Sequence, residues 1–190
     1  MKFNRRIRRT LSALTLLFLC GGPMSKSNAA TLPSITVEGL GGGVYQAVGQ
    51  FSVLVSSRDV WEILVDYDRI GKYVSSIESC KVKERRPDYV LVEQINRQGI
   101  GFLHRRFEVL LKVKETPQTR IDFEDLLKKS FDSYSGSWEI ESVGEQSRIT
   151  HRLQVKVSSV VPAFLIRGFL QRGVGQVLNE VKTEIERKKK

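Results

Sequence analysis

Four polar side chains that could do chemistry fall on strand faces that are otherwise apolar. Arg105, Asp125, Tyr134 and His151 each share a strand phase with apolar residues. If these apolar faces point inward, the four side chains would lie in or near one cavity, where a few polar groups orient the polar end of a ligand. Because burying an unpaired charge is costly, Arg105 would need a partner, either Asp125 or an oxygen of the ligand.

Proton transfer is the reaction that such residues support, with His151 as a general base and Arg105 stabilising an enolate. Both residues also have structural interpretations: Arg105 would extend to water from a strand end, and His151 would be a hydrogen-bonded core residue. His104 lies on the opposite, polar face of its strand, and Cys80 has no Cys-x-x-Cys companion. The sequence therefore predicts neither a metal site nor a cofactor, and it shows no Ser/His/Asp spacing or phosphate loop.

The elements that must position these residues follow a simple order after residue 44. A strand comes first, then two short helices, then an unbroken run of strands, and last one long helix. Short links between the strands imply a largely antiparallel sheet. The expected strands, separated by turn signals, are Tyr45–Val55, Glu78–Arg86, Tyr89–Arg97, Phe102–Lys114, Arg120–Leu126, Ser133–Ser142 and Ser147–Val157.

The helices are marked by their capping residues and apolar spacing. Ser56 and Asp59 have the spacing of a capping box, and Asp68 is placed to cap a second short helix. Pro162 opens the last helix, whose apolar residues recur at helical spacing as far as Ile185. A single helix after so many strands can cover only the concave side of the sheet. The chain therefore predicts an α+β fold, in which a curved antiparallel sheet of about seven strands wraps around a long C-terminal helix.

A sheet bent around one helix tends to enclose a cavity, and a mostly apolar cavity is typical of a protein that carries an apolar ligand. Three glycines in the first half of the helix, at positions 168, 173 and 175, favour close packing on the sheet. Alternatively, they allow the helix to shift and admit a ligand. The residues expected to contact this ligand are Leu103, Arg105, Phe107, Phe123, Tyr134, Trp138, His151, Leu153, Phe169 and Leu170.

The first 29 residues have the pattern of an export signal. A basic stretch from Lys2 to Arg9 precedes the short apolar run Leu11–Cys20, and Ser27–Ala29 is a small-residue cleavage site. We expect cleavage near Ala29 and a periplasmic or equivalent extracytoplasmic location, with a retained N-terminal anchor as the alternative. Residues 30–43, which contain three consecutive glycines, are expected to be a flexible lead-in to a domain at residues 44–190.

The strongly basic composition is largely a property of this N-terminal segment. Residues 1–29 hold six basic and no acidic residues, so their removal lowers the net charge from +10 to +4. No recognition helix, aromatic RNA-binding strand or zinc spacing accompanies the remaining charge, and we therefore expect no nucleic-acid partner. If Cys20 is removed with the signal, Cys80 is left alone and no internal disulfide forms.

Several segments, which together span about residues 44–187, resemble the START/polyketide-cyclase (SRPBCC) superfamily with its helix-grip fold. More narrowly, they resemble its coenzyme Q-binding and polyketide cyclase/dehydrase subgroup. The chain departs from the pattern at His151, where related sequences often carry an aromatic residue such as Tyr. The segments that carry the resemblance are Val60–Asp68 with Ile70 and Tyr73, Val90–Gln94, Gly136–Ile140, Arg148–Leu153 and Pro162–Leu165.

The resemblance implies a protein that holds an apolar small molecule, a lipid or an isoprenoid or quinone-like compound, between sheet and helix. The alternative that it implies is a polyketide cyclase/dehydrase-type enzyme using His151 and Arg105. Because one fold hosts both activities, the resemblance alone does not choose between them. The apolar segment Val160–Ile166 at the start of the last helix is expected to belong to the core or, alternatively, to contact a membrane surface transiently during lipid exchange.

Overall fold

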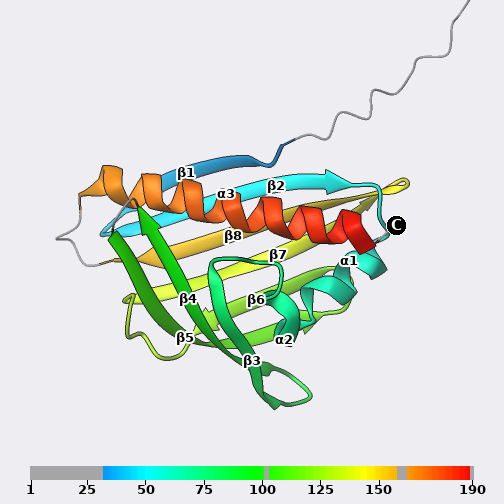
Figure 1. Ribbon diagram of the computed structural model, residues 1–190, viewed down its shortest axis with the longest axis horizontal. Helices are drawn as coiled ribbons and strands as arrows, with labels where there is room; N and C mark the ends of the chain where they lie inside the picture. Colours follow the sequence, from blue (N-terminus) through cyan, green and yellow to red (C-terminus); the bar gives the residue numbers. More distant parts are fainter. Residues whose placement is uncertain (1–31, 101–102, 158–161, 189–190) are drawn as a thin grey trace, which may run out of the picture. The chain divides into compact units, whose positions relative to one another are not determined.

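Eight strands in the described part of the chain form one antiparallel sheet, in the order β1-β2-β8-β7-β6-β5-β4-β3 (Figure 1). The computed structural model describes residues 32–100, 103–157 and 162–188, without side chains for 98–100 and 103–105. The strands are β1 (Ser34–Gly41), β2 (Val44–Val53), β3 (Ile77–Arg85), β4 (Val90–Ile100), β5 (Leu103–Thr116), β6 (Arg120–Asp125), β7 (Ser133–Val143) and β8 (Gln146–Lys156). The helices are α1 (Ser57–Leu64), α2 (Tyr67–Ile70) and α3 (Ala163–Lys188).

The long helix α3 lies across one face of the sheet and packs chiefly against β1 and β2, while α1 lies near its C-terminal half (Figure 1). It begins directly after Pro162, whose carbonyl accepts a hydrogen bond from the backbone N–H of Leu165 at 3.0 Å. The predicted α+β architecture, a curved antiparallel sheet around a C-terminal helix with two short helices after an early strand, is confirmed.

The structure differs from the sequence prediction at the lead-in, because residues 34–41 form strand β1 instead of a flexible segment. The strand pairs with β2, and its side chains Ile35 and Val37 are partly buried against the core. Residues 41–43 have φ angles of 88°, 58° and 78°, which glycine adopts without strain, and they form the turn between the two strands. The glycine triplet is thus a hairpin turn, and the sheet has one strand more than expected.

The two short helices are fixed by different hydrogen bonds, one a cap at the start of α1 and the other a contact from α2 to the sheet. The Ser56 side chain accepts a hydrogen bond from the backbone N–H of Asp59 at 3.2 Å, so the predicted cap of α1 is confirmed. The prediction that Asp68 caps α2 is wrong, because Asp68 lies within that helix. Its carboxylate accepts a hydrogen bond from the backbone N–H of Val82 at 3.0 Å. Since β3 is an edge strand, Asp68 satisfies a sheet N–H that has no neighbouring strand.

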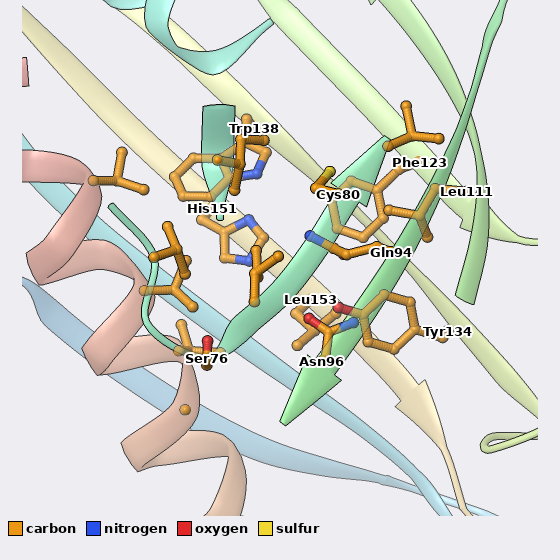
Figure 2. A pocket seen from close by; sticks show the side chains of 18 of the residues that line it. Ser76, Cys80, Gln94, Asn96, Leu111, Phe123, Tyr134, Trp138, His151 and Leu153 are labelled. Atoms are coloured by element: carbon orange, nitrogen blue, oxygen red, sulfur yellow. The ribbon is translucent and has the colours of Figure 1, made fainter. Parts of the chain in front are cut away.

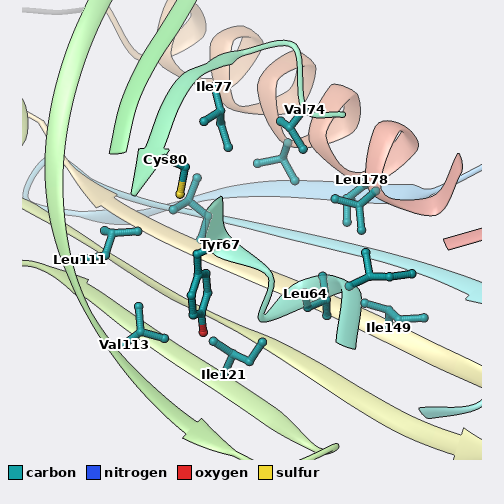
Figure 3. Close-up of a cluster of buried hydrophobic side chains, with 14 of the residues drawn as sticks. Leu64, Tyr67, Val74, Ile77, Cys80, Leu111, Val113, Ile121, Ile149 and Leu178 are labelled. Atoms are coloured by element: carbon teal, nitrogen blue, oxygen red, sulfur yellow. The ribbon is translucent and has the colours of Figure 1, made fainter. Parts of the chain in front are cut away.

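The core lies between α3 and the concave face of the sheet, where apolar side chains from every layer meet (Figure 3). Leu178, near the middle of α3, is fully buried and reaches down to β2 at Gly49. A Cβ at position 49 would lie 2.1 Å from Leu178 Cδ1, which is far inside van der Waals contact. The absence of a side chain at Gly49 therefore lets the helix approach the strand.

We expect Gly49→Ala to lower the free energy of unfolding by about 1–3 kcal/mol, because the added methyl group must displace a buried leucine. Gly168→Ala is the matched control: its Cβ would meet Arg172 Nη2 at 3.5 Å, and alanine should stabilise α3 by up to about 1 kcal/mol. Urea unfolding of both variants measures these changes. Equal stability of Gly49→Ala and the wild type would contradict the proposed close approach.

Candidate ligand-binding cavity

A cavity of about 140 Å³ lies beneath α3, enclosed by the helix, the segment from α1 to β3 and the concave side of the sheet. A cavity of this size holds a single aromatic ring, whereas pockets for larger ligands measure about 300–1,000 Å³. The structure places eight of the predicted contact residues in its lining: Phe107, Phe123, Tyr134, Trp138, His151, Leu153, Phe169 and Leu170. Their contact with a ligand stays a prediction, and the side chains of Leu103 and Arg105 lie outside the described residues.

One wall of the cavity is a continuous chain of aromatic rings from four strands, β5 to β8, and a loop. The His151 ring stacks on Trp138, with 4.1 Å between ring centroids, and lies 6.0 Å from Phe123. Phe131, in the connection before β7, contacts both Phe107 and Tyr134 with centroids 5.4 Å apart. Phe131 could not be predicted from the sequence, because a loop residue has no strand phase from which its direction can be inferred.

His151 is buried in this aromatic wall and makes one hydrogen bond to the backbone. Its Nδ1 lies 3.1 Å from the carbonyl oxygen of Ser137, which can only accept, so Nδ1 carries the proton and Nε2 is an acceptor. Burial lowers the pKa of His151 to about 4, against the opposing effect of the Ser137 carbonyl. The ring is therefore neutral near pH 7 and a weak base.

Asp125 lies beside the cavity but is not among its lining residues. Its carboxylate accepts hydrogen bonds from the backbone N–H groups of Leu110, Leu127 and Lys128 at 3.0, 3.0 and 2.9 Å. These bonds fix the connection that leaves β6, and a pairing with Arg105 stays a prediction. Burial and the nearby Asp125 charge raise the pKa of Tyr134 to about 12, so the Tyr134 hydroxyl stays protonated.

Strand β4 supplies two polar lining residues that the sequence analysis did not single out. Gln94 and Asn96 are buried on the face that also carries Val90 and Val92, and both side chains extend into the cavity (Figure 2). Ser76, at the start of the neighbouring strand β3, also lines the cavity. Strand phase counted from Val90 and Val92 was the available signal, since residues two apart point to the same side of a strand.

Among the described residues that line the cavity, none carries a carboxylate, an ammonium or a guanidinium group. Burial, with a smaller effect of Asp68, raises the pKa of the Cys80 thiol to about 12, so this lining cysteine is protonated and unreactive. Tyr67 donates a hydrogen bond from its hydroxyl to Glu115 at 2.8 Å, and burial raises its pKa as well. The described lining of the cavity is thus mostly apolar and uncharged, with a few neutral polar groups.

A set of hydrogen bonds joins the segment after α2 to α3, where the two close over the cavity. The Glu180 carboxylate accepts from the Ser75 backbone N–H at 3.0 Å and from the Ser75 hydroxyl at 2.5 Å. Gln176 donates to the Ser75 hydroxyl at 2.7 Å. We call Ser75, Gln176 and Glu180 the Ser75 latch. Their side chains are at the surface, so the latch can open without exposing the core.

Two further features concern the described parts of the chain as a whole. No group of three or more His, Cys, Asp or Glu residues in residues 32–97, 106–157 and 162–188 could hold a metal ion. Of the helices described, none is both long and apolar enough to cross a membrane. Phe164 and Leu165 are exposed at the start of α3, whereas Val160 and Val161 lie outside the described residues. Contact of this segment with a membrane surface stays a prediction.

The fold and the cavity define a START-like protein of the kind that binds lipids or polyketides between a curved sheet and a C-terminal helix. Residues 53–182 match the family described as polyketide cyclase / dehydrase and lipid transport, and the chain belongs to this family. The predicted family is therefore confirmed. Among curated protein sequences, none matches this chain.

Solved structures with the same fold include both enzymes and lipid-transfer proteins. The Zhui aromatase/cyclase from Streptomyces sp. R1128 has a TM-score of 0.68 at 15% identity, covering 77% of this chain and 96% of its own. A STAR-related lipid transfer protein from Xanthomonas axonopodis has a TM-score of 0.60 at 10% identity, covering 80% and 98%. Human StAR-related lipid transfer protein 5 has a TM-score of 0.61 at 10% identity, covering 87% of this chain and 90% of its own. At these identities the likeness shows the fold alone.

The low pKa of His151 predicts a specific loss of stability in acid. In the unfolded chain His151 takes up a proton near pH 6.5, but in the folded protein only near pH 4, so its contribution to stability falls as the pH drops between these values. Over this interval the wild type should lose about 3 kcal/mol more than His151→Phe, in which only the other groups titrate. Urea unfolding at pH 7 and pH 4 measures the difference. Equal losses in the two proteins would contradict a neutral, buried His151.

Proposed function

We propose that this protein binds an apolar small molecule, a lipid or an isoprenoid or quinone-like compound, and carries it outside the cytoplasm. The single observation that supports binding is the cavity beneath α3, whose described lining is mostly apolar and uncharged. Such a space favours the transfer of an apolar molecule out of water by roughly 25 cal/mol per Å² of buried apolar surface. Export follows from the signal-like pattern of residues 1–29.

Carriage of a whole lipid requires the cavity to widen beyond about 140 Å³. Two features favour movement between α3 and the segment after α2. The helix turn around Gly173 lines the cavity without a side chain, and the Ser75 latch is made of surface hydrogen bonds that water can replace. In the closed state, the cavity holds a ring or a short part of the ligand. Opening of the latch admits the remainder.

Binding without catalysis agrees best with the environment of His151. A general base works best when its pKa lies near the working pH, whereas burial lowers the pKa of His151 to about 4. The stacking on Trp138 and the bond to Ser137 hold the ring in one orientation, which suits an acceptor that orients a ligand. The cyclase-type alternative would need His151 to take a proton from the ligand, a step that this low basicity disfavours.

Native mass spectrometry of the protein, purified gently from its own host and followed by solvent extraction, tests the proposed function. We expect one apolar molecule to co-purify per chain, because release from a mostly apolar cavity would expose the apolar surface of the ligand to water. The extracted compound identifies the ligand class. A protein that arrives empty and takes up nothing from a total lipid extract would contradict the proposal.

A ring placed in the cavity should abolish this uptake. Val177 lines the cavity from α3 and is half-buried, so Val177→Phe should fill space that the ligand needs. We expect the variant to lose its co-purifying molecule while its thermal unfolding midpoint stays within a few degrees of the wild type, since the ring enters existing space. Asn179→Phe, on the exposed side of the same helix, is the control that should retain the ligand. Full ligand occupancy in Val177→Phe would place the ligand elsewhere.

A further inference from the structure

Asn96 carries a buried hydrogen-bond donor that no described group satisfies. The residue is only 7% exposed, and its amide nitrogen Nδ2 is buried without a hydrogen-bond partner. Leaving a buried donor unpaired destabilises the folded state, and native proteins keep few such groups. Within the described part of the chain, Nδ2 of Asn96 is the one buried side-chain polar atom of this kind. An unpaired buried donor of this kind needs an explanation, and a bound ligand that accepts its hydrogen bond is one.

The backbone holds this amide in place from both sides. Asn96 lies opposite Ile77 on β3 and opposite Phe107 on β5, in the interior of the sheet. The following residue, Arg97, donates its backbone N–H to the carbonyl of Ser76 at 2.8 Å. Figure 2 shows the Asn96 side chain extending into the cavity from the same face of β4 as Gln94. A donor on a strand paired on both sides is positioned before any ligand arrives.

The charge of the surroundings restricts what this donor can bind. An anionic head group, such as a carboxylate or a phosphate, would enter a space whose described lining offers no positive charge. Burying an unpaired charge costs several kcal/mol, which one amide hydrogen bond does not offset. A plain hydrocarbon would enter readily but would leave Nδ2 unpaired. A neutral carbonyl oxygen satisfies both conditions, because it accepts a hydrogen bond and carries no charge.

We propose that the ligand carries an uncharged carbonyl group, as a ketone, quinone or ester does, and that this oxygen accepts a hydrogen bond from Asn96 Nδ2 inside the cavity. This inference rests on the proposed function, since it assumes that a ligand occupies the space beneath α3. It goes further in naming the chemical group that the protein selects. The apolar remainder of the ligand then contacts the aromatic wall and α3.

Three probes with one aromatic ring each, acetophenone, ethylbenzene and benzoate, test this selectivity on the full domain. They are of similar size and suit a cavity of about 140 Å³, but only acetophenone carries a neutral carbonyl. We expect acetophenone to bind about tenfold more tightly than ethylbenzene, the factor expected for one hydrogen bond in a buried site, and benzoate to bind most weakly. Titration of ¹⁵N-labelled protein gives the affinities. The side-chain NH₂ signals of Asn96 should shift with acetophenone and not with ethylbenzene.

Asn96→Leu removes the donor and keeps the size of the side chain. In this variant acetophenone and ethylbenzene should bind equally, and the thermal midpoint of the ligand-free protein should be unchanged or higher, because an unsatisfied polar group has been removed. Asn179→Leu makes the same chemical change on the exposed side of α3 and should keep the tenfold preference. If Asn96→Leu does not fold, the side-chain NH₂ signals of Asn96 in the wild type still show whether acetophenone contacts this donor.

The outcomes separate this inference from the function on which it rests. If no probe binds, the proposed function itself fails, and the inference fails with it. If ethylbenzene binds the wild type as tightly as acetophenone, the cavity binds apolar molecules but Asn96 does not select a carbonyl. A preference for acetophenone that persists in Asn96→Leu, or tightest binding of benzoate, would likewise overturn the inference.

Discussion

The structure depends on one constraint: a single straight helix must cover the apolar face of a curved sheet. Leu178 of α3 meets the bare backbone of Gly49 on β2, which lets the helix approach the sheet closely at this point. The helix packs on β1, β2 and β4 but contacts β5 to β8 little, so space remains between the helix and these middle strands. The cavity is therefore a geometric consequence of the fold, and the sequence decides only what lines it.

The lining combines two properties that rarely coexist in a protein core. The aromatic wall includes His151, which burial keeps neutral, while Gln94 and Asn96 on β4 and Ser76 just before β3 offer neutral hydrogen-bonding groups. Polar groups of this kind lower the stability of the empty protein, since a fully apolar interior would pack without them. Their presence in the lining is the observation on which the proposed polar contact with a ligand rests.

Much of the fold could be predicted from periodicity, because strands such as β2 and β8 bury alternate residues and the apolar residues of α3 form one buried stripe. The cap at Ser56 and the helix start after Pro162 followed from local chemistry in the same way. Strand β1 was missed, since three consecutive glycines indicate flexibility in a sequence but form a hairpin turn once Ile35 and Val37 find a surface. Asp68 was misassigned because its partner, the N–H of Val82, is distant in the sequence.

The cavity residues also divide into those that strand phase can predict and those that depend on contacts in the folded chain. Strand phase placed Phe107, Trp138 and His151 correctly around one space, whereas Phe131 could not be placed from a loop. Asn96 was visible by phase, but its importance depends on having no partner, which is a property of the folded environment and not of the residue. Unsatisfied groups can be recognised only when all neighbours are known, so the unpaired donor of Asn96 could not be predicted from the sequence.

The pairing of β2 with β8 has a consequence for how the chain acquires its structure. Val53 lies opposite Ser147, so β2 can pair with β8 only after about a hundred further residues have been synthesised. Until then the β1–β2 hairpin has an open edge and an uncovered apolar face, and α3, which covers that face, comes last of all. Such high contact order favours slow folding through a partly folded state whose exposed apolar surface is prone to aggregation. In such an intermediate the apolar concave face stays exposed until α3 covers it, so the last helix to be synthesised is also the one that ends this exposure.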